Sequence, residues 1–452
     1  MVTESRVAAA PARTELGWLH RRFRLSERGT TPRTEIIAGA TTFLAAAYLL
    51  VVIPSILASG GLDRAAVTTT TIMVFVAATL FMAFYANLPF IVGPGIGGSV
   101  IVATTLVLSE GVKWQIGIAI AFWSGVLFVI LTLLGLREVV TRMVPVQIKL
   151  ALSASIGLFI AVLGFRNAGL VLANAKTNAM MLGDFTAPGA LVALIGLAIA
   201  ILLHARKVPG SILWAILGAT AIGIPLGVTK LPSSLLSLPH DIAPVTWQLD
   251  FLGALSPVFI PYLFAFFAAE FFSTMGTTLA VGGKAGLLDA HGNMPDINRP
   301  FVVDSIAATI GPLFGVPALT ALIESAAGVE AGGRTGLTAV AAAMLFLLAL
   351  VFVPAALMIP AQATAPALIL IGLSMFSGLK KVDLEDFTDG LPAILMVLLT
   401  VLSNSFGTGI AGGLLAYVLI KLLAGKGRDV SLGMYVLALP LTYYFWTVVS
   451  RH

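Results

Sequence analysis

Apolar runs of about 20 residues recur along nearly the whole chain, and they limit its fold more than any other feature. A helix needs about 20 apolar residues to cross a hydrocarbon core of ~30 Å, and its backbone groups must be paired within the segment. Of the 452 residues, 58% are hydrophobic and only 10% are charged, whereas a soluble domain carries about 25% charged residues. The sequence therefore predicts an all-α polytopic membrane protein.

The apolar runs divide into fourteen expected transmembrane segments and one further apolar segment at 432–448. The last segment is expected to be a surface helix rather than an extra span. The expected spans are 36–57, 67–85, 90–108, 114–136, 150–172, 188–204, 211–228, 257–281, 300–314, 311–337, 337–358, 364–376, 391–406 and 409–423.

The distribution of basic residues predicts the orientation of these spans. Cytoplasmic loops of membrane proteins carry an excess of Lys and Arg. With the N-terminus inside, all but five of the 26 Lys and Arg residues fall on the inner side. The sequence thus predicts a multi-pass cell-membrane protein with a cytoplasmic N-terminus. The five exceptions are Arg64, Lys113, Arg166, Lys176 and Lys230.

Two of the fourteen spans are too interrupted to be regular helices. Gly93, Pro94 and Gly95 break the third span, and repeated Gly and Pro residues break the tenth, 311–337. The third and tenth spans hold the same position in each group of seven. Transporters built from inverted repeats place their binding site at such paired breaks, so the breaks predict a 7+7 inverted repeat and a central site.

Two acidic residues within the spans are the strongest site candidates. Glu324 lies in the middle of the broken tenth span, and Glu270 lies in the eighth. At helical spacing, Glu270 shares a polar stripe with Ser273, Thr274 and Thr277. Charged groups at membrane depth are costly and usually serve a substrate or ion pathway. Packing of the small residues against another helix is the alternative for this stripe.

Other charged residues are expected to be structural. Asp304 is expected to cap the ninth span or to pair with Arg299, and Glu330 to pair with Arg334 at the surface. Acidic residues between 383 and 389 are expected to lie in a solvated loop.

The sequence offers little for enzyme chemistry. It contains no Cys, and its five His residues are scattered without metal-ligand spacing. No phosphate-binding loop is present, so transport driven by ATP within this chain is not expected. We predict no catalytic residues, no metal site and no cofactor. An ion gradient is the expected source of energy.

A collinear set of motifs resembles one transporter family. The runs AFYANLPF and GPGIG come first, then SGVLFVILTLLGLRE and SASIGLFIAVLGFRNAGLV. KAGLLDAHGNMPDINRPFVVDSIAATIGPLFG, TALIESAAGVEAGGRTGLTAV and ATAPALILIG follow. Together they resemble the AzgA-like purine permeases of the nucleobase–cation symporter-2 family, in order, from about residue 39 to residue 423.

The resemblance implies a mobile core and a gate, with short strands at the two breaks. The core would comprise residues 35–145 and 250–360, and the gate 146–229 and 361–425. From their polar, Arg-rich sequence, residues 1–34 are expected to form a solvated cytoplasmic tail, and residues 426–452 form a C-terminal segment. The core would move against the gate like an elevator, with a proton as partner ion and a homodimer formed through the gate.

The resemblance also places the substrate between the eighth span and the two breaks. Glu270 and Glu324 are the candidates for proton coupling. The expected substrate-binding residues are Glu324, Glu270, Ser273, Thr274, Gly95, Ile96, Gly97, Ser325 and Ala326.

Several positions depart from the family pattern near this site. Ser273 stands where relatives usually carry an aspartate, and Ser99 stands where an asparagine is common. Ala45 and Ile53 replace polar residues of the first span. A pyrimidine such as uracil, or a small anion such as sulfate or bicarbonate, is the alternative substrate. The only basic residue near the centre is Arg334, which disfavours an anion.

Overall fold

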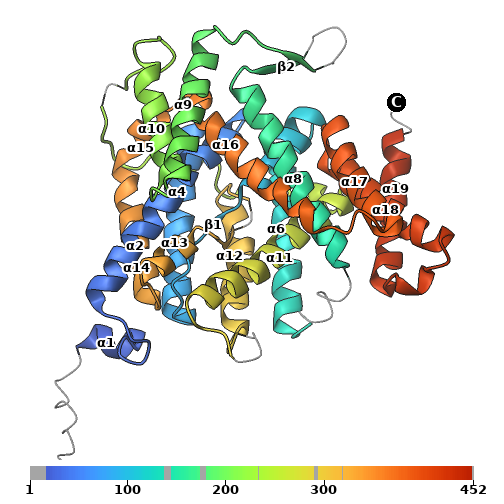
Figure 1. The fold of residues 1–452 in the computed structure, drawn as a ribbon, viewed down its shortest axis with the longest axis horizontal. Helices are drawn as coiled ribbons and strands as arrows, with labels where there is room; N and C mark the ends of the chain where they lie inside the picture. The colour runs from blue at the N-terminus through green and yellow to red at the C-terminus, as the bar shows by residue number, and fades with distance from the viewer. Residues whose placement is uncertain are drawn as a thin grey trace, which may run out of the picture.

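The computed structural model describes residues 17–136, 144–173, 180–232, 234–289, 294–317 and 319–449. Several residues used for the orientation lie outside these ranges: Arg6, Arg13, Arg137, Arg142, Lys176 and Arg451. Figure 1 shows a bundle of helices with two pairs of very short strands.

The first half contains α1 (Trp18–Phe23), α2 (Pro32–Ala46), α3 (Leu49–Ser59), α4 (Arg64–Phe81), β1 (Val92–Pro94), α5 (Ile96–Val100), α6 (Trp114–Leu133), α8 (Val146–Asn167), β2 (Val171–Ala173), β3 (Met180–Leu182), α9 (Pro188–Ala205) and α10 (Ser211–Gly223). The second half contains α11 (Ile260–Lys284), α12 (Asn298–Leu313), β4 (Leu319–Ala321), α13 (Ser325–Glu330), α14 (Gly336–Ala349), α15 (Val353–Leu357), α16 (Ala361–Phe376), α17 (Phe387–Leu402), α18 (Phe406–Leu423) and α19 (Leu432–Val449).

Among the described residues, nine helical segments are long and apolar enough to cross a membrane. Four shorter apolar helices accompany them, including α10, α17 and α19. The multi-pass helical architecture expected from the sequence is therefore present.

Polar side chains cap the first turns of several apolar helices. The Thr31 hydroxyl accepts a hydrogen bond from the backbone N–H of Thr34 at the start of α2, and the Asp63 carboxylate accepts one from Ala66 at the start of α4. Ser405 does the same for α18. Such caps satisfy backbone groups that have no partner within the helix. They determine where these helices begin.

The two breaks meet in a short antiparallel sheet. Val92 lies opposite Ala321, and Pro94 lies opposite Leu319. The Thr79 hydroxyl holds both the N–H and the carbonyl of Val92, at 3.1 and 3.2 Å. Proline has no N–H to donate to a ladder, which limits this pairing to three residues. The strands implied at the breaks are thus present as β1 and β4.

The fifth expected span ends earlier than the sequence suggested. The helix α8 stops at Asn167, and Gly169 adopts the left-handed conformation with φ of +73°. The N–H groups of Gly169 and Leu170 then bond back to Arg166 and Phe165. This is a glycine helix cap, so residues 168–172 leave the helix and lead into the β2–β3 hairpin.

The helices pack in two groups. In one, α2 and α4 contact α14, and α6 contacts α12. In the other, α8 contacts α16 and α17, α9 contacts α10, and α17 contacts α18. At the α8–α16 crossing, a Cβ on Gly372 would lie 2.5 Å from the backbone of Ala161. The two helices approach closely there because both carry small residues.

Parts of the N-terminal segment are buried, contrary to the expected solvated tail. Phe23 and Leu25 are 1% and 0% exposed, and they pack against Leu337 at the start of α14. At the other end of the chain, α19 packs against α18 and α11. Large apolar residues on its outer side, including Leu439 and Trp446, are exposed.

Candidate functional site

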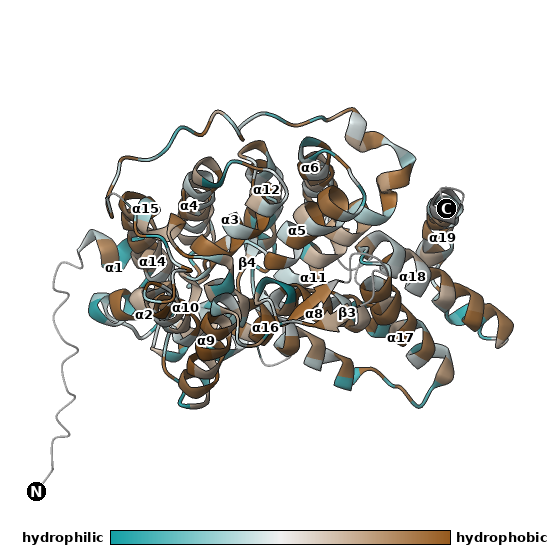
Figure 2. Ribbon diagram, turned by 90° about the horizontal axis from the view of Figure 1, so that it is seen from above, coloured by the Kyte–Doolittle hydropathy of each residue, from teal (hydrophilic) through white to brown (hydrophobic). Residues whose placement is uncertain are grey.

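Several segments converge at the middle of the molecule. They are the two breaks, α11, and the first expected span, which is interrupted between α2 and α3. The short sheet contacts both α11 and α12, while α5 contacts α3, α8 and α11. Figure 2 shows β4 near the centre of the bundle, with these helices around it. This is the junction where the sequence predicted a site.

Glu324 stands immediately before α13, at the end of the second break. Its Oε1 accepts a 2.6 Å hydrogen bond from the Tyr48 hydroxyl. Tyr48, 2% exposed, lies between α2 and α3, where the regular helical hydrogen bonding of the first expected span is interrupted for two residues. The second oxygen, Oε2, is buried and has no partner among the described residues. One acceptor of this carboxylate is therefore available.

Glu270 faces the other break from α11. Its side chain is 4% exposed, and its Oε1 lies 4.0 Å from the position that a Cβ on Gly95 would occupy. Its Oε2 is also buried without a partner in the described part of the chain. Of the expected polar stripe, Thr274 and Thr277 are buried while Ser273 is half-buried. Glu270 thus points toward the start of α5.

Asp304 makes structural contacts, as expected, but the expected helix cap and the expected pair with Arg299 were both wrong. Arg299 pairs with Asp296 instead, at 3.9 Å. Asp304 is fully buried in α12, where its Oδ2 accepts hydrogen bonds from the Thr274 hydroxyl at 2.7 Å and the Ala321 N–H at 2.8 Å. It therefore ties α11 to β4 behind Glu270. The short sequence distance to Arg299 misled the prediction, although an acid inside the apolar run FVVDSIAA was itself a signal.

Some of the remaining predicted residues lie at or near the starts of α5 and α13, and others are used in contacts within the protein. Gly95 and Ile96 start α5, and Ala326 is half-buried in α13 beside Glu324. A Cβ on Gly97 would lie 3.1 Å from the Ile156 side chain of α8, so this glycine permits a close approach. Ser325 is already occupied. Its hydroxyl donates to the Leu322 carbonyl at 2.7 Å and accepts from the Ile91 N–H at 3.0 Å, which fastens one break to the other.

Two of the four residues that depart from the family pattern are buried, and Ala45 and Ser273 are half-buried. Ser99 is 0% exposed, and its hydroxyl bonds to the Gly95 carbonyl within the same turn. Ile53 is likewise fully buried in α3. The junction is therefore lined on these sides by apolar or internally satisfied groups, and carboxylates supply its unsatisfied acceptors.

Sequence reasoning missed one buried acid, Glu35, near the start of α2. Its carboxylate accepts hydrogen bonds from the backbone N–H groups of Arg334, Thr335 and Thr338, and from the two threonine hydroxyls. Both oxygens are satisfied. Glu35 therefore fixes α2 to the start of α14 and offers no acceptor to a ligand. The prediction missed Glu35 because the first expected span began at residue 36.

The predicted surface pair of Glu330 and Arg334 is also corrected. Glu330 pairs with Lys284, while Arg334 bonds to the carbonyls of Val329 and Gly333. The pair expected from spacing along a helix fails because α13 ends at Glu330.

The acidic loop before α17 is only partly solvated. Asp389 pairs with the buried Lys421 at 2.7 Å, and Asp386 contacts Lys426 at 3.1 Å. Hydrogen bonds from the Thr388 hydroxyl and N–H, together with Lys426, hold the pKa of Asp386 well below its usual range. These contacts join the start of α17 to the end of α18.

Comparison with known proteins bears on this geometry. A profile described as "Permease family" (Xan_ur_permease) matches residues 33–418, most of the chain. The chain belongs to this permease family. It is 36% identical over 424 residues to adenine permease AdeQ of Escherichia coli strain K12, covering 94% of this chain and 95% of that one. It is 34% identical over 442 residues to guanine/hypoxanthine permease GhxP of Escherichia coli O157:H7, covering 97% and 98%.

A solved transporter shares the fold of this permease. The transmembrane domain of a cyanobacterial bicarbonate transporter, BicA, aligns with a TM-score of 0.61 and 18% sequence identity, covering 82% of this chain and 96% of that one. The likeness shows the fold alone and leaves the substrate to be argued from the site. The family resemblance seen in the sequence motifs is confirmed.

Proposed function

We propose that the chain imports a purine nucleobase across the cell membrane, coupled to protons. The observation that carries the proposal is the pair of carboxylates at the junction of the breaks, Glu270 and Glu324, each with one buried oxygen that has no partner among the described residues. Purine permeases at 34–36% identity over nearly the whole chain support the substrate class.

A purine fits the hydrogen-bonding character of the proposed site. Ionised carboxylates only accept hydrogen bonds, and purine rings present N–H and amine donors. Bonds to a charged acceptor are about twice as strong as neutral ones. Glu324, steadied by Tyr48, would accept from one edge of the base, and Glu270 from a second edge. Backbone N–H groups in the first turn of α5 have no partner within the helix and would serve the ring nitrogens.

Asp304 acts in this scheme through its neighbours. Its Oδ2 holds the Thr274 hydroxyl and the Ala321 backbone, so it would position the α11 face and β4. Its Oδ1 is buried without a partner in the described ranges, as is one oxygen of each glutamate. Two acceptor-only carboxylates would repel an anion at close range, which argues against sulfate or bicarbonate.

The proton coupling that we propose uses the same two acids. When protonated, a carboxyl group gains a donor and loses its charge, so Glu270 and Glu324 would bind a base differently in their two protonation states. A ligand can drive a conformational change only through such a difference between states. Replacing either acid with glutamine would break the coupling.

Alternating access is proposed to be an elevator movement within fourteen spans. Helices within residues 35–145 and 250–360 pack mainly on one another, as do helices within 146–229 and 361–425. We take the first set as the moving core and the second as the gate, through which two copies would dimerise. The excess of basic residues on one side supports a cytoplasmic N-terminus.

Polar contacts bridge the proposed core and gate at one end. The Asn404 amide donates to the Ser109 hydroxyl at 2.5 Å, and Ser405 donates to Glu110 at 2.8 Å. Tyr262 of α11 also donates to Glu110. With the N-terminus inside, this end faces outward. We propose that these bonds close the outer entrance and break when the core moves.

Uptake into proteoliposomes tests the function. We expect labelled adenine, guanine or hypoxanthine to accumulate when an inward proton gradient is imposed, and to stop accumulating when a protonophore collapses the gradient. Glu324→Gln should abolish uptake, whereas Glu330→Gln, a surface carboxylate at the end of the short helix that follows Glu324, should leave it intact. Saturable uptake of a purine by Glu324→Gln would contradict the assignment of this residue.

A further inference from the structure

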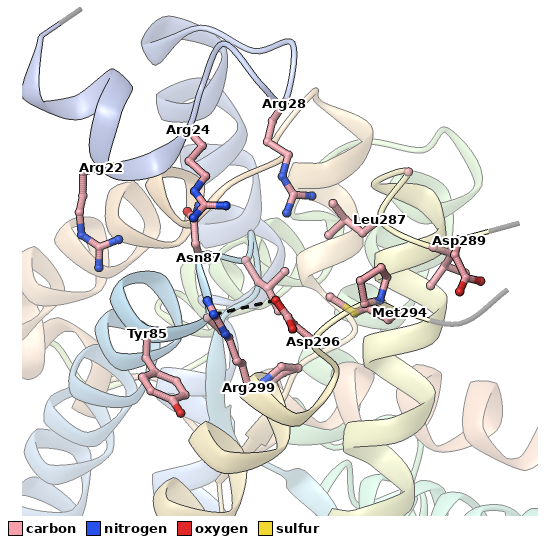
Figure 3. A pocket seen from close by; sticks show the side chains of 16 residues that line it. Arg22, Arg24, Arg28, Tyr85, Asn87, Leu287, Asp289, Met294, Asp296 and Arg299 are labelled. Carbon is pink, nitrogen blue, oxygen red and sulfur yellow. Dashed lines mark ion pairs between the residues drawn. The ribbon is translucent and has the colours of Figure 1, made fainter. Parts of the chain in front are cut away.

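A cavity of about 300 Å³ lies where the N-terminal segment covers one end of the helix bundle. Figure 3 shows its walls. They come from α1 and the turn that follows it, from residues 85–88 after α4, from residues 286–289 and 294–296, and from the start of α12. Four arginines line it: Arg22, Arg24, Arg28 and Arg299. The cavity is separate from the junction that holds Glu270 and Glu324.

The N-terminal wall of this cavity is fixed in place. Phe23 and Leu25 are buried on either side of Arg24, which adopts the left-handed conformation with φ of +53°. This conformation is unfavourable for a residue with a side chain. The Asn87 amide donates to the Phe23 carbonyl at 3.1 Å and accepts from the Gly336 N–H at 2.9 Å. The segment is therefore a fixed part of the fold, and it directs the Arg24 side chain into the cavity between the two buried residues Phe23 and Leu25.

The charges around the cavity are unbalanced. Arg24 and Arg28 reach down from the N-terminal segment, and Arg299 rises from the start of α12 (Figure 3). Arg299 has a carboxylate at 3.9 Å, Asp296, whereas neither Arg24 nor Arg28 has an ion-pair partner in the described ranges. With Asp289 as the second acid in the lining, four arginines face two aspartates. The net charge of these six groups is positive by two.

We propose that this cavity binds the phosphate group of a phosphomonoester between Arg24, Arg28 and Arg299. The guanidinium group presents its N–H donors in a planar fork that matches phosphate oxygens. A phosphomonoester carries about 1.5 to 2 negative charges at pH 7, which matches the excess charge of the lining. A general preference for basic residues on the inner side explains the presence of arginines, but it does not explain their convergence on one concave space.

Two sources would supply the same chemistry. A soluble phosphomonoester would reach the cavity from solvent, and phosphatidic acid would present the same group from the membrane surface. In either case the anion would hold the N-terminal segment against the start of α12. The inference stands independently of the transported substrate.

Thermal stability of the purified full-length protein tests the proposal. The soluble probes are inorganic phosphate and glycerol 3-phosphate, titrated at constant ionic strength with NaCl because exposed charges are screened by salt. Neither probe contains a purine ring, so neither acts as a nucleobase at the proposed transport site. The lipid probe is phosphatidic acid in nanodiscs, compared with phosphatidylcholine alone. The variant is Arg24→Gln with Arg28→Gln. Its matched control is Arg21→Gln, an exposed arginine of α1 that does not line the cavity.

We expect a saturable rise in Tm for the wild type and for Arg21→Gln, with half-saturation at least tenfold higher in the double variant. A response to the soluble probes identifies a soluble ligand, and a response to phosphatidic acid alone identifies the lipid. No saturable rise in any arm, or an equal rise in the double variant, would overturn the proposal. Direct binding of labelled phosphate to the wild type provides the same decision if the double variant is unstable.

Discussion

Replacing Glu35 with glutamine should destabilise the protein strongly without touching the proposed substrate site. The wild-type carboxylate accepts five hydrogen bonds: one on Oε1 from Arg334, and four on Oε2 from Thr335 and Thr338. Glutamine has a single oxygen, so its NH₂ group must face at least one donor.

The magnitude follows from these contacts. A hydrogen bond to a charged group contributes about 1.5–3 kcal/mol and a neutral one about 0.5–1.5, while an unsatisfied buried group costs about 1–3 kcal/mol. In the best arrangement, four bonds weaken by roughly 1 kcal/mol each and the Arg334 N–H loses its partner. The desolvation cost of the buried charge disappears at the same time and offsets part of this loss. We expect a net destabilisation of about 2–4 kcal/mol.

The assay is heating of purified protein followed by recovery of the monodisperse fraction by size-exclusion chromatography. Glu330→Gln is the matched control, because Glu330 forms an exposed ion pair with Lys284. The side chains of Glu330 and Lys284 are 63% and 53% exposed. An exposed pair contributes about 0–1 kcal/mol. We expect a clear fall in the apparent Tm for Glu35→Gln and almost none for Glu330→Gln. Equal effects of the two variants would refute the reasoning.

Three further predictions concern the site and the proposed movement. Tyr48→Phe removes the 2.6 Å hydrogen bond to Glu324, and the loss of about 1.4 kcal/mol should raise the half-saturation concentration for substrate about tenfold; an unchanged value would contradict a role for Tyr48 in positioning. Gly372→Val should prevent normal folding, because even a Cβ would lie 2.5 Å from the backbone of α8; the yield of monodisperse protein measures this, and a normal yield would refute the packing argument. The wild-type chain contains no Cys, so Ser109→Cys with Asn404→Cys allows a clean crosslink between the proposed core and gate. Oxidation should stop transport and reduction should restore it, whereas transport by the crosslinked protein would contradict the proposed movement.

The helical membrane architecture was predictable because it depends on local composition. Long apolar runs such as 114–136 allow few other structures. Gly93, Pro94 and Gly95 predicted a break in the third span, and the structure shows β1 and α5 there. Cap positions also follow from local chemistry, as with Thr31 and Asp63. The helix end at Asn167 was missed because Gly169 lies within an apolar run and its left-handed conformation is not visible from hydropathy.

The site was only partly predictable because its contacts join distant segments. Glu324 and Glu270 stood out as acids in apolar surroundings, and both are found at the junction. Tyr48 lies 276 residues from Glu324 in sequence, and no local pattern connects them. Asp304 had a plausible neighbour in Arg299, but the three-dimensional arrangement gave it Thr274 and Ala321 instead. Partner choice among charged groups depends on tertiary geometry, which spacing does not report.

Equilibrium binding of purines to the purified protein tests the central claim most directly. Adenine, guanine and hypoxanthine would be titrated by calorimetry, with uracil and sulfate as comparison ligands, into wild type, Glu324→Gln and Glu330→Gln. We predict saturable binding of at least one purine to the wild type and to Glu330→Gln, and its loss in Glu324→Gln. Binding of uracil or sulfate but no purine, or undiminished purine binding by Glu324→Gln, would contradict the claim that buried carboxylates at the paired breaks recognise a purine.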